Sequence, residues 1–395
     1  MTMPPPHPAP TTSDTVGALS LVDPDTPFAV LDRAKATHNI ARLADHVRTL
    51  NVSLRPHLKT AKSLAVAALI HGDTPGPITV STLAEAEAFA DGGYADILYA
   101  VGIDPHKLPR VIALLRRGIT LSVLLDSTEQ ARAVRDASTA ARMPIPALIE
   151  VDCDGHRGGV TLQDPRLVEI GRILAESDSL AGVLVHAGES YFATTRAEQH
   201  KAADHERDVA AAQQLREAGL RVDTVSVGST PTAHAATDLT GVTEVRAGNY
   251  VFFDLVMAGL GVCEVGDLAL SVVVTVIGHR PEHGWILTDG GWMAMSRDRG
   301  TANQRVDQGY GLVTDLNGNP VPQLLMSGAS QEHGILSTRD GSPLPDLPVG
   351  TRLRVLPNHA CATAAQHHGY HVIDSSRDTP GTPMIQAYWG RVTGW

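Results

Sequence analysis

Between about residue 50 and residue 250 the chain alternates short apolar runs, rich in β-branched residues, with longer amphipathic stretches. This alternation is typical of strand–helix–strand units, in which helices connect parallel strands. Polar or glycine-rich residues follow nearly every run, at the strand ends where barrel enzymes carry their chemistry. The pattern predicts eight strands, enough to close a barrel, at residues 53–57, 78–82, 96–101, 121–125, 146–152, 182–188, 223–228 and 243–248.

The stretches between these runs have helical spacing. Residues 83–93 combine apolar periodicity with a glycine stop, and residues 205–220 repeat the pattern, so each is predicted to be a helix. Residues 26–43 read as a short strand running into a helix that connects two domains. The same alternation also fits a doubly wound open sheet, which is the structural alternative to a barrel.

After about residue 265 the helical periodicity fades, and short β runs separated by turn residues take over. Such a pattern of short β runs and turns is typical of antiparallel sheets. We therefore predict an α/β protein with an N-terminal (β/α)8 TIM-like barrel over 25–264 and a C-terminal antiparallel β domain over 265–395. A disordered Pro-rich tail is predicted over 1–24.

The bulk properties narrow the function classes. The 395 residues carry a formal net charge of −11, so the basic excess that attracts nucleic acid or anionic membranes is missing. No run approaches the roughly 20 apolar residues of a spanning helix, and the first residues do not resemble a signal peptide. We expect a cytoplasmic protein. Its three cysteines are widely spaced, which argues against a disulfide scaffold.

Lys59 lies in LRPHLKTAKS, at the end of the first predicted barrel strand. Inside a barrel mouth a lysine is partly desolvated and more easily deprotonated, as Schiff-base formation requires. Lys59 is therefore the candidate for a covalent cofactor link. The alternative is that Lys59 and Lys62 are ordinary surface lysines in a loop.

Two loops follow the seventh and eighth predicted strands, the usual phosphate site of a barrel. Their small and hydroxyl residues allow backbone N–H groups to approach an anion, although a glycine followed by hydroxyl residues is also an ordinary turn. The candidate phosphate ligands are Gly228, Ser229, Thr230, Gly248, Asn249 and Tyr250.

His359 and Cys361 occur in PNHAC, late in the β domain. Residues two apart on a strand project to the same face, so both side chains can hold one metal ion. Imidazole and thiolate suit zinc, and two protein ligands leave positions open for water or substrate. The alternative is a buried cysteine beside a surface histidine.

Several further polar residues are weaker candidates. Arg157, in EVDCDGHRGG, is placed to bring positive charge near a cofactor, although arginines at strand ends often simply pair with carboxylates. The others are His186, Tyr191, Glu332 and His333.

Taken together, TPFAVLD, RPHLKTAKS, VSTLAEAE, SVGSTPT, RAGNYVFFD, EHG and PNHAC resemble the D-serine dehydratase and D-threonine aldolase family, whose fold is similar to that of alanine racemase. The resemblance runs from about residue 25 to the C-terminus. It implies that Lys59 carries pyridoxal 5'-phosphate in Schiff-base linkage and that the loops at 228–230 and 248–250 hold the phosphate. It also implies that Tyr191 lies near the cofactor ring and that His359 and Cys361 bind a divalent metal.

The resemblance also bears on the reaction. Dehydratases of the family resemble this chain in having His-x-Cys, whereas the aldolases usually have His-x-Asp. A thiolate favours Zn²⁺, while a carboxylate better tolerates Mn²⁺ or Mg²⁺. One departure is Leu184, seven residues before Tyr191, where a tyrosine is expected in D-serine dehydratases. It weakens an assignment to D-serine and leaves D-threo-3-hydroxyaspartate open.

The sequence thus predicts a lyase: a pyridoxal-phosphate- and metal-dependent dehydratase of D-serine, D-threonine or D-threo-3-hydroxyaspartate that gives a 2-oxo acid and ammonia. The alternative is an aldolase of the D-threonine type, giving glycine and an aldehyde. An amino acid racemase and a non-catalytic pyridoxal-phosphate-binding protein are more distant alternatives. From the resemblance we expect a homodimer that acts on a small-molecule D-amino acid.

Overall fold

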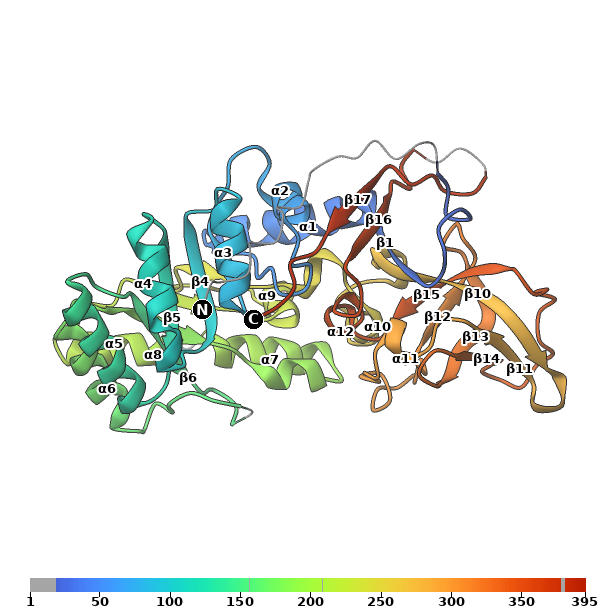
Figure 1. Cartoon of the computed structure of the whole chain (residues 1–395). Coiled ribbons are helices and arrows are strands. Elements are labelled where there is room, and N and C mark those ends of the chain that lie inside the picture. The colour runs from blue at the N-terminus through green and yellow to red at the C-terminus, as the bar shows by residue number, and fades with distance from the viewer. Residues whose placement is uncertain (1–18, 156, 208, 378–380) are drawn as a thin grey trace.

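The computed structural model describes residues 19–155, 157–207, 209–377 and 381–395. They form two lobes, each built on one large β-sheet (Figure 1). In the first lobe helices surround a parallel sheet, and the second lobe is mainly antiparallel sheet with short helices.

The first sheet contains eight parallel strands, which pair in the order β2-β9-β8-β7-β6-β5-β4-β3. A further parallel bridge joins His57, just after β2, to Thr79 in β3 and so closes the sheet into a ring. The predicted (β/α)8 barrel is confirmed, and the open-sheet alternative is wrong. The strands are β2 (Ser53–Leu54), β3 (Ile78–Val80), β4 (Asp96–Gly102), β5 (Thr120–Leu125), β6 (Ala147–Val151), β7 (Leu180–Val185), β8 (Thr224–Val227) and β9 (Glu244–Val245).

Helices cover the outside of this barrel (Figure 1). Several begin at polar residues whose side-chain oxygens accept the first free backbone N–H groups, as Asp32, Thr82 and Ser127 do for α1, α3 and α5. The helices are α1 (Arg33–Thr49), α2 (Leu64–His71), α3 (Leu83–Asp91), α4 (Leu108–Arg116), α5 (Thr128–Ala141), α6 (Arg166–Ala175), α7 (Arg196–Glu206), α8 (Ala210–Glu217), α9 (Thr230–Ala235) and α10 (Leu255–Gly259), with one-turn 3-10 helices at η1 (Pro105–Lys107), η2 (Gly188–Phe192), η3 (Asn249–Val251) and η4 (Val265–Asp267).

The stretch 205–220 is not the single helix that its periodicity predicts. Helix α7 ends at Glu206, and α8 begins only at Ala210. At the break the Glu206 carboxylate is buried and accepts hydrogen bonds from the Ala187 N–H and the Thr232 hydroxyl. Tertiary hydrogen bonds at Glu206 thus coincide with the interruption of the helical pattern.

Alternate residues of the barrel strands face opposite sides. Those facing the helices join the main hydrophobic core. Leucines from four consecutive strands form a separate small cluster, and their alternation with the core residues places them on the inner face of the barrel. They are Leu98, Leu124, Leu148 and Leu184.

The second sheet has nine strands in the order β11-β14-β13-β12-β15-β10-β1-β16-β17, and β11 also pairs with β10. This extra pairing closes the strands from β10 to β15 into a six-stranded barrel, beside which β1, β16 and β17 form an extension. The elements are β1 (Phe28–Asp32), β10 (Leu270–Arg280), β11 (Trp285–Thr288), β12 (Gly311–Thr314), β13 (Pro320–Ala329), β14 (Gly334–Thr338), β15 (Arg352–Pro357), β16 (Gly369–Ile373), β17 (Ala387–Gly390), α11 (Trp292–Met295), α12 (Ala360–Ala364) and η5 (Pro281–His283).

The chain crosses between the lobes more than once. Strand β1 pairs with β10 and β16 in the second sheet, and α1, which follows directly, packs on the barrel elements β2 and α9. The connecting role expected of residues 26–43 is therefore confirmed. After β17 the chain returns to the first lobe (Figure 1), where the Val392 N–H donates to the Lys62 carbonyl at 2.6 Å.

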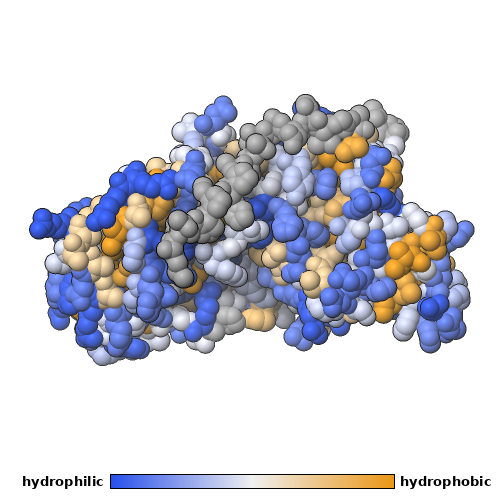
Figure 2. Space-filling view, viewed as in Figure 1, coloured by the Kyte–Doolittle hydropathy of each residue, from blue (hydrophilic) through white to orange (hydrophobic). Residues whose placement is uncertain are grey.

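Of the predicted Pro-rich tail, 1–24, residues 1–18 lie outside the described residues. Its last six residues are described, and Leu21 among them is fully buried against the second sheet. The face in Figure 2 is largely hydrophilic, with small hydrophobic patches. Within the described ranges, no helix has the length and apolar character needed to cross a bilayer.

Candidate active site

Lys59 lies just beyond β2, beside the bridge that closes the barrel. Protein surrounds its amino group on most sides, although the side chain is exposed at the barrel mouth. This desolvation lowers the pKa of Lys59; Cys361 opposes the shift, while Arg157 and Arg246 add to it. A lysine with a lowered pKa is more often neutral and is therefore more available as a nucleophile or base at neutral pH.

Neither Lys59 nor Lys62 is surrounded like an ordinary surface lysine, which was the alternative that the sequence left open. The Lys62 ammonium is ion-paired with the buried Glu85 at 2.8 Å, and the Trp395 ring lies 5.7 Å from it. Lys59 instead shares its surroundings with Cys361. Lys59 thus has a lowered pKa at this site, whereas Lys62 is engaged by Glu85.

The two predicted phosphate loops lie together. Ser229 caps α9, and the Tyr250 N–H in the second loop donates to the Thr230 hydroxyl in the first at 3.2 Å. Gly228 has a φ of +136°, and a Cβ there would lie 2.0 Å from the Arg246 carbonyl oxygen, so only glycine fits. The loops after β8 and β9 thus bring six small or polar residues to one end of the barrel.

The first loop is held by a ring of buried hydrogen bonds. The Ser229 hydroxyl lies 2.9 Å from both the Thr232 and the Ser190 hydroxyls, and Thr232 also donates to Glu206. Ser190 and Glu206 complete the ring at Ala187, whose carbonyl accepts from Ser190 and whose N–H donates to Glu206. This ring fixes the loop in place before any ligand binds.

Tyr191 and His186 border the same loop. The Tyr191 ring lies 6.3 Å from the His186 ring, and the Thr230 backbone is close enough to affect the pKa of its hydroxyl. The His186 Nδ1 lies 3.2 Å from the Gly228 carbonyl oxygen. Burial, with the charges of Arg246 and Lys59, lowers the pKa of His186 to about 3, so the ring is neutral.

Arg157 shows both features considered for it. Its guanidinium donates to the Glu150 carboxylate at 2.9 Å, which is the ordinary pairing of an arginine at a strand end. Its charge also lowers the pKa of Lys59, which places it near the barrel mouth. Glu332 and His333, by contrast, lie exposed in the turn between β13 and β14.

His359 and Cys361 do not lie on a strand, so the reason given for their convergence is wrong. Strand β15 ends at Pro357, His359 caps α12 in an extended conformation, and Cys361 lies in the first turn of the helix. The two groups are nevertheless close enough that each shifts the pKa of the other. Thr60, next to Lys59 in sequence, has its hydroxyl oxygen 3.0 Å from the Cys361 sulfur.

The electrostatics of this pair favour a cation. Burial alone would raise the pKa of the Cys361 thiol, but His359, Lys59 and Thr60 together lower it. Burial would lower the pKa of His359, but Cys361 and Asp298 raise it to about 11. The lowered pKa of Cys361 favours the thiolate, which is the form of cysteine that binds a metal. Across the described residues, this site included, no group of three or more His, Cys, Asp or Glu side chains is arranged to hold a metal, so His359 and Cys361 stand as a pair of possible ligands.

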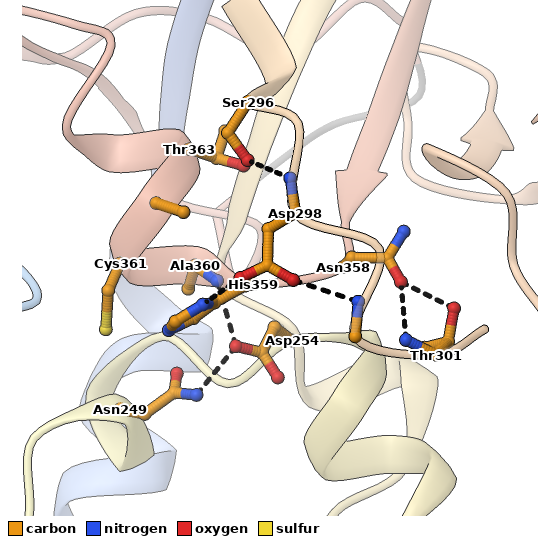
Figure 3. A network of polar contacts seen from close by, with 12 residues as sticks. Asn249, Asp254, Ser296, Asp298, Thr301, Asn358, His359, Ala360, Cys361 and Thr363 are labelled. Atoms are coloured by element: carbon orange, nitrogen blue, oxygen red, sulfur yellow. Dashed lines mark hydrogen bonds and ion pairs between the residues drawn. The ribbon is translucent and has the colours of Figure 1, made fainter. Parts of the chain in front are cut away.

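Two acidic residues that the sequence reasoning missed contact this segment (Figure 3). Asp298 lies 2.6 Å from the Nδ1 of His359. Asp254 is fully buried and accepts from the Ala360 N–H at 2.8 Å and from the Asn249 amide at 2.6 Å. Asp254 thereby links the second phosphate loop to the His359–Cys361 segment. No local pattern marks either residue, because both contacts join segments distant in sequence.

Comparisons with known proteins agree with this arrangement. The family profile "Alanine racemase, N-terminal domain" matches residues 31–256, and the alanine racemase of Clostridium difficile aligns over 88% of this chain and 95% of its own with a TM-score of 0.62 at 13% identity. The fold thus defines the class, an alanine-racemase-like protein with a barrel and a β domain. A second profile, "Putative serine dehydratase domain", matches residues 269–373.

Individual relatives are more specific. D-threo-3-hydroxyaspartate dehydratase from Delftia sp. is 50% identical over 95% of this chain and 99% of its own, and its solved structure superposes with a TM-score of 0.91. D-serine dehydratase from Dictyostelium discoideum is 28% identical over 92% of this chain and 97% of its own. D-threonine aldolase from Filomicrobium marinum, 27% identical, superposes with a TM-score of 0.79 over 97% of this chain and 98% of its own. The chain belongs to the D-serine dehydratase and D-threonine aldolase family, and it is a lyase, as the resemblance predicted.

Proposed function

We propose that this protein is a pyridoxal-phosphate- and divalent-metal-dependent dehydratase, which converts a small D-3-hydroxy amino acid into a 2-oxo acid and ammonia. The single observation that carries the proposal is the contact between Thr60 and Cys361 at 3.0 Å, because it brings the Lys59 segment and the His359–Cys361 pair to one place. The 50% identity to a D-threo-3-hydroxyaspartate dehydratase makes D-threo-3-hydroxyaspartate the first substrate to test.

The barrel mouth fits pyridoxal phosphate. Lys59 would carry the cofactor aldehyde, and residues 228–230 and 248–250 would hold its phosphate. Asn249 supplies an independent sign of a ligand, because its buried Oδ1 has no hydrogen-bond partner among the described residues. Tyr191, next to Thr230, would lie beside the ring, and Arg157 would add positive charge near the mouth.

The His359–Cys361 pair fits a divalent metal. Zn²⁺ suits an imidazole with a thiolate, and Mn²⁺ and Mg²⁺ are the alternatives to compare. A solved structure of a D-threo-3-hydroxyaspartate dehydratase is described as a cysteine-to-alanine mutant in the metal-free form, and another as a histidine-to-alanine mutant. These mutants support a metal role for the equivalent residue types here.

When bound, pyridoxal phosphate supplies an electron sink and the metal supplies a Lewis acid for the substrate 3-oxygen. Once the substrate amine has replaced it, Lys59 would accept the proton from the substrate α carbon, and its lowered pKa favours the neutral form that this role needs. The bond between the 3-carbon and its oxygen then breaks, and the oxygen leaves as water with that proton. Addition of water to the remaining unsaturated amine gives the 2-oxo acid and ammonia, so one water is released and one consumed.

The proposal assigns the two parts of the reaction to residues from different domains. His359 and Cys361 come from the β domain, whereas Lys59 comes from the barrel, so the substrate 3-oxygen and α proton would be handled from two different elements. The Tyr370 hydroxyl donates to the Ala61 carbonyl at 2.7 Å and helps to hold the domains in this relation.

The test is to incubate the zinc- and cofactor-loaded protein separately with D-threo-3-hydroxyaspartate, D-serine and D-threonine, and to quantify 2-oxo acid, ammonia, glycine and aldehyde. Equal amounts of 2-oxo acid and ammonia support the proposal. Glycine with an aldehyde would instead make the protein an aldolase and would show that Cys361 does not decide the reaction. A product of inverted configuration alone would indicate a racemase.

We also propose that residues 25–264 bind the cofactor and residues 265–395 supply the metal ligands, although β1 itself lies in the second sheet. A cytoplasmic homodimer is the proposed working form. All three cysteines are free, as expected in a reducing compartment, and Trp395, 85% exposed, is a large side chain available for contact with a second copy. Light scattering on the purified protein tests the dimer, which a monomeric mass would exclude.

A further inference from the structure

Asp298 faces the candidate metal ligand His359 (Figure 3). Its Oδ2 lies 2.6 Å from the His359 Nδ1. An ionised carboxylate only accepts hydrogen bonds, so the proton of this pair belongs on Nδ1, and the lone pair of a neutral imidazole is then on Nε2. We propose that Asp298 is the positioning residue that fixes the tautomer and ring orientation of His359 for metal binding. The proposal rests on the proposed metal function of His359 and Cys361.

Asp298 is itself held in one orientation. Its Oδ1 accepts from the Gly300 N–H at 2.9 Å, and its own N–H donates to the Ser296 hydroxyl at 3.2 Å. Each carboxylate oxygen therefore has its own partner, one in the loop and one on His359. A carboxylate that is held at both oxygens cannot rotate without losing a hydrogen bond, so it restrains the imidazole that it contacts.

The loop that carries Asp298 is also fastened to the segment that carries His359. The Thr301 N–H donates to the Oδ1 of Asn358 at 3.1 Å, and the Asn358 amide donates to the Gly309 carbonyl at 2.7 Å. Thr301 is fully buried and Asn358 nearly so. Because Asn358 immediately precedes His359, these buried bonds fix the relative positions of the two segments on one side of the Asp298–His359 contact.

These supports distinguish the contact from an ordinary surface ion pair. The Asp298 side chain is 35% exposed and the His359 side chain 39%. An ion pair with that exposure would restrain the imidazole little if both side chains were free to move. Here the backbone on both sides is restrained by buried hydrogen bonds. Carboxylates that hold the second nitrogen of a metal-binding histidine typically change metal affinity by about 10- to 100-fold.

The experiment measures the Zn²⁺ dissociation constant of the full-length, cofactor-loaded protein by competition with a chromophoric chelator. Asp298→Ala should weaken zinc binding by about 10- to 100-fold. Asp298→Asn keeps the shape and an acceptor for the Nδ1 proton but loses the charge, so its dissociation constant should fall between those of Asp298→Ala and the wild type. Asp315→Asn, which removes a carboxylate from the turn between β12 and β13, is the matched control and should leave zinc affinity unchanged.

Two further measurements separate positioning from simple structural support. The cofactor absorbance and the thermal midpoint of the zinc-free protein are recorded for each variant. Weaker zinc binding with both of these unchanged supports the inference. A lower thermal midpoint with zinc affinity within about twofold of the wild type overturns it, because Asp298 would then serve the fold alone.

His359→Ala distinguishes a failure of this inference from a failure of the proposed function. If His359→Ala loses zinc and Asp298→Ala does not, only the role of Asp298 is wrong. If His359→Ala and Cys361→Ala both retain stoichiometric zinc, the proposed metal site is wrong, and the inference is overturned with it.

Discussion

The hydroxyl oxygen of Thr60 lies 3.0 Å from the sulfur of Cys361, although 301 positions separate the two residues in the sequence. Thr60 follows Lys59 in the barrel, and Cys361 belongs to the first turn of α12 in the second lobe. The contact therefore makes the candidate cofactor lysine and the candidate metal pair parts of one site. Each prediction below tests one element of that site or of the contacts that hold it.

Replacing Lys59 should remove both the cofactor link and the base. Lys59→Ala is expected to lose the visible absorbance of bound pyridoxal phosphate and to lower kcat by at least about 100-fold, the lower range for a general base. Lys62→Met, which breaks the ion pair with Glu85, is the comparison and should keep the absorbance. An absorbance spectrum of Lys59→Ala identical to that of the wild type would assign the cofactor to another residue.

Removing the metal should distinguish the role of the metal from that of pyridoxal phosphate. Treatment with a strong chelator is expected to leave the pyridoxal phosphate absorbance in place while dehydratase activity falls by at least about 100-fold, because the Lewis acid contributes several kcal/mol. Added Zn²⁺ should restore the wild type but not Cys361→Ala. Full activity in a chelated sample with no metal by mass spectrometry would contradict the assignment of His359 and Cys361.

Glu206 should make stability depend on pH. Burial raises its pKa to about 7, above the ordinary value of 4.5, despite hydrogen bonds from Thr232 and Ala187 that oppose the shift. Between pH 4.5 and 7 the folded protein keeps a proton that the unfolded chain has lost, so stability falls as pH rises. The loss reaches the order of 3 kcal/mol above pH 7 and is absent below pH 4.5.

Glu206→Gln keeps the side-chain shape but cannot titrate, so it serves as the measure of this effect. Its thermal midpoint should exceed that of the wild type increasingly as pH is raised from 5 to 8, with cofactor content matched in both. Parallel pH profiles for the two proteins would show that Glu206 is ionised throughout this range.

Tyr370 should contribute to the contact between the lobes. Tyr370→Phe removes the hydroxyl that donates to the Ala61 carbonyl at 2.7 Å in a fully buried position. A buried carbonyl deprived of its partner typically costs about 1–3 kcal/mol, so the urea midpoint should fall. Tyr388→Phe, at a position 46% exposed, is the control and should change it little. Equal urea midpoints for Tyr370→Phe and Tyr388→Phe would show that the Tyr370 hydroxyl does not stabilise the contact between the lobes.

Much of the fold could be predicted, because the barrel strands follow the alternation of buried and exposed positions along the chain. The pattern located each of the eight strands of the first sheet and the change of texture after residue 265. It failed at 205–220, where local periodicity predicts one helix but the buried hydrogen bonds of Glu206 accompany a break. Local spacing carries no information about such tertiary partners.

The candidate site was predictable where function lies at a strand end and not where it depends on contacts across the lobes. Lys59 and the loops at 228–230 and 248–250 follow barrel strands, so their gathering could be expected. His359 and Cys361 were found, but the strand geometry invoked for them was wrong, because the chain turns into α12 at this point. Asp298 could not be found, since its segment, SRDRGT, resembles any polar loop.

Strand β1 has a consequence for the order in which the protein forms during synthesis. Phe28 pairs with Val273 and Val30 pairs with His371, so β1 has no partner until β10 follows the complete barrel, and its second partner, β16, comes near the end of the chain. The barrel strands pair only with one another, and their partners emerge earlier. We therefore expect the first lobe to be largely formed while β1 is still unpaired. An unpaired strand of this kind is prone to aggregation or misassembly. Pairing with β16 would end that exposure, and α12, which carries Cys361 to Thr60, lies directly before β16 in the chain.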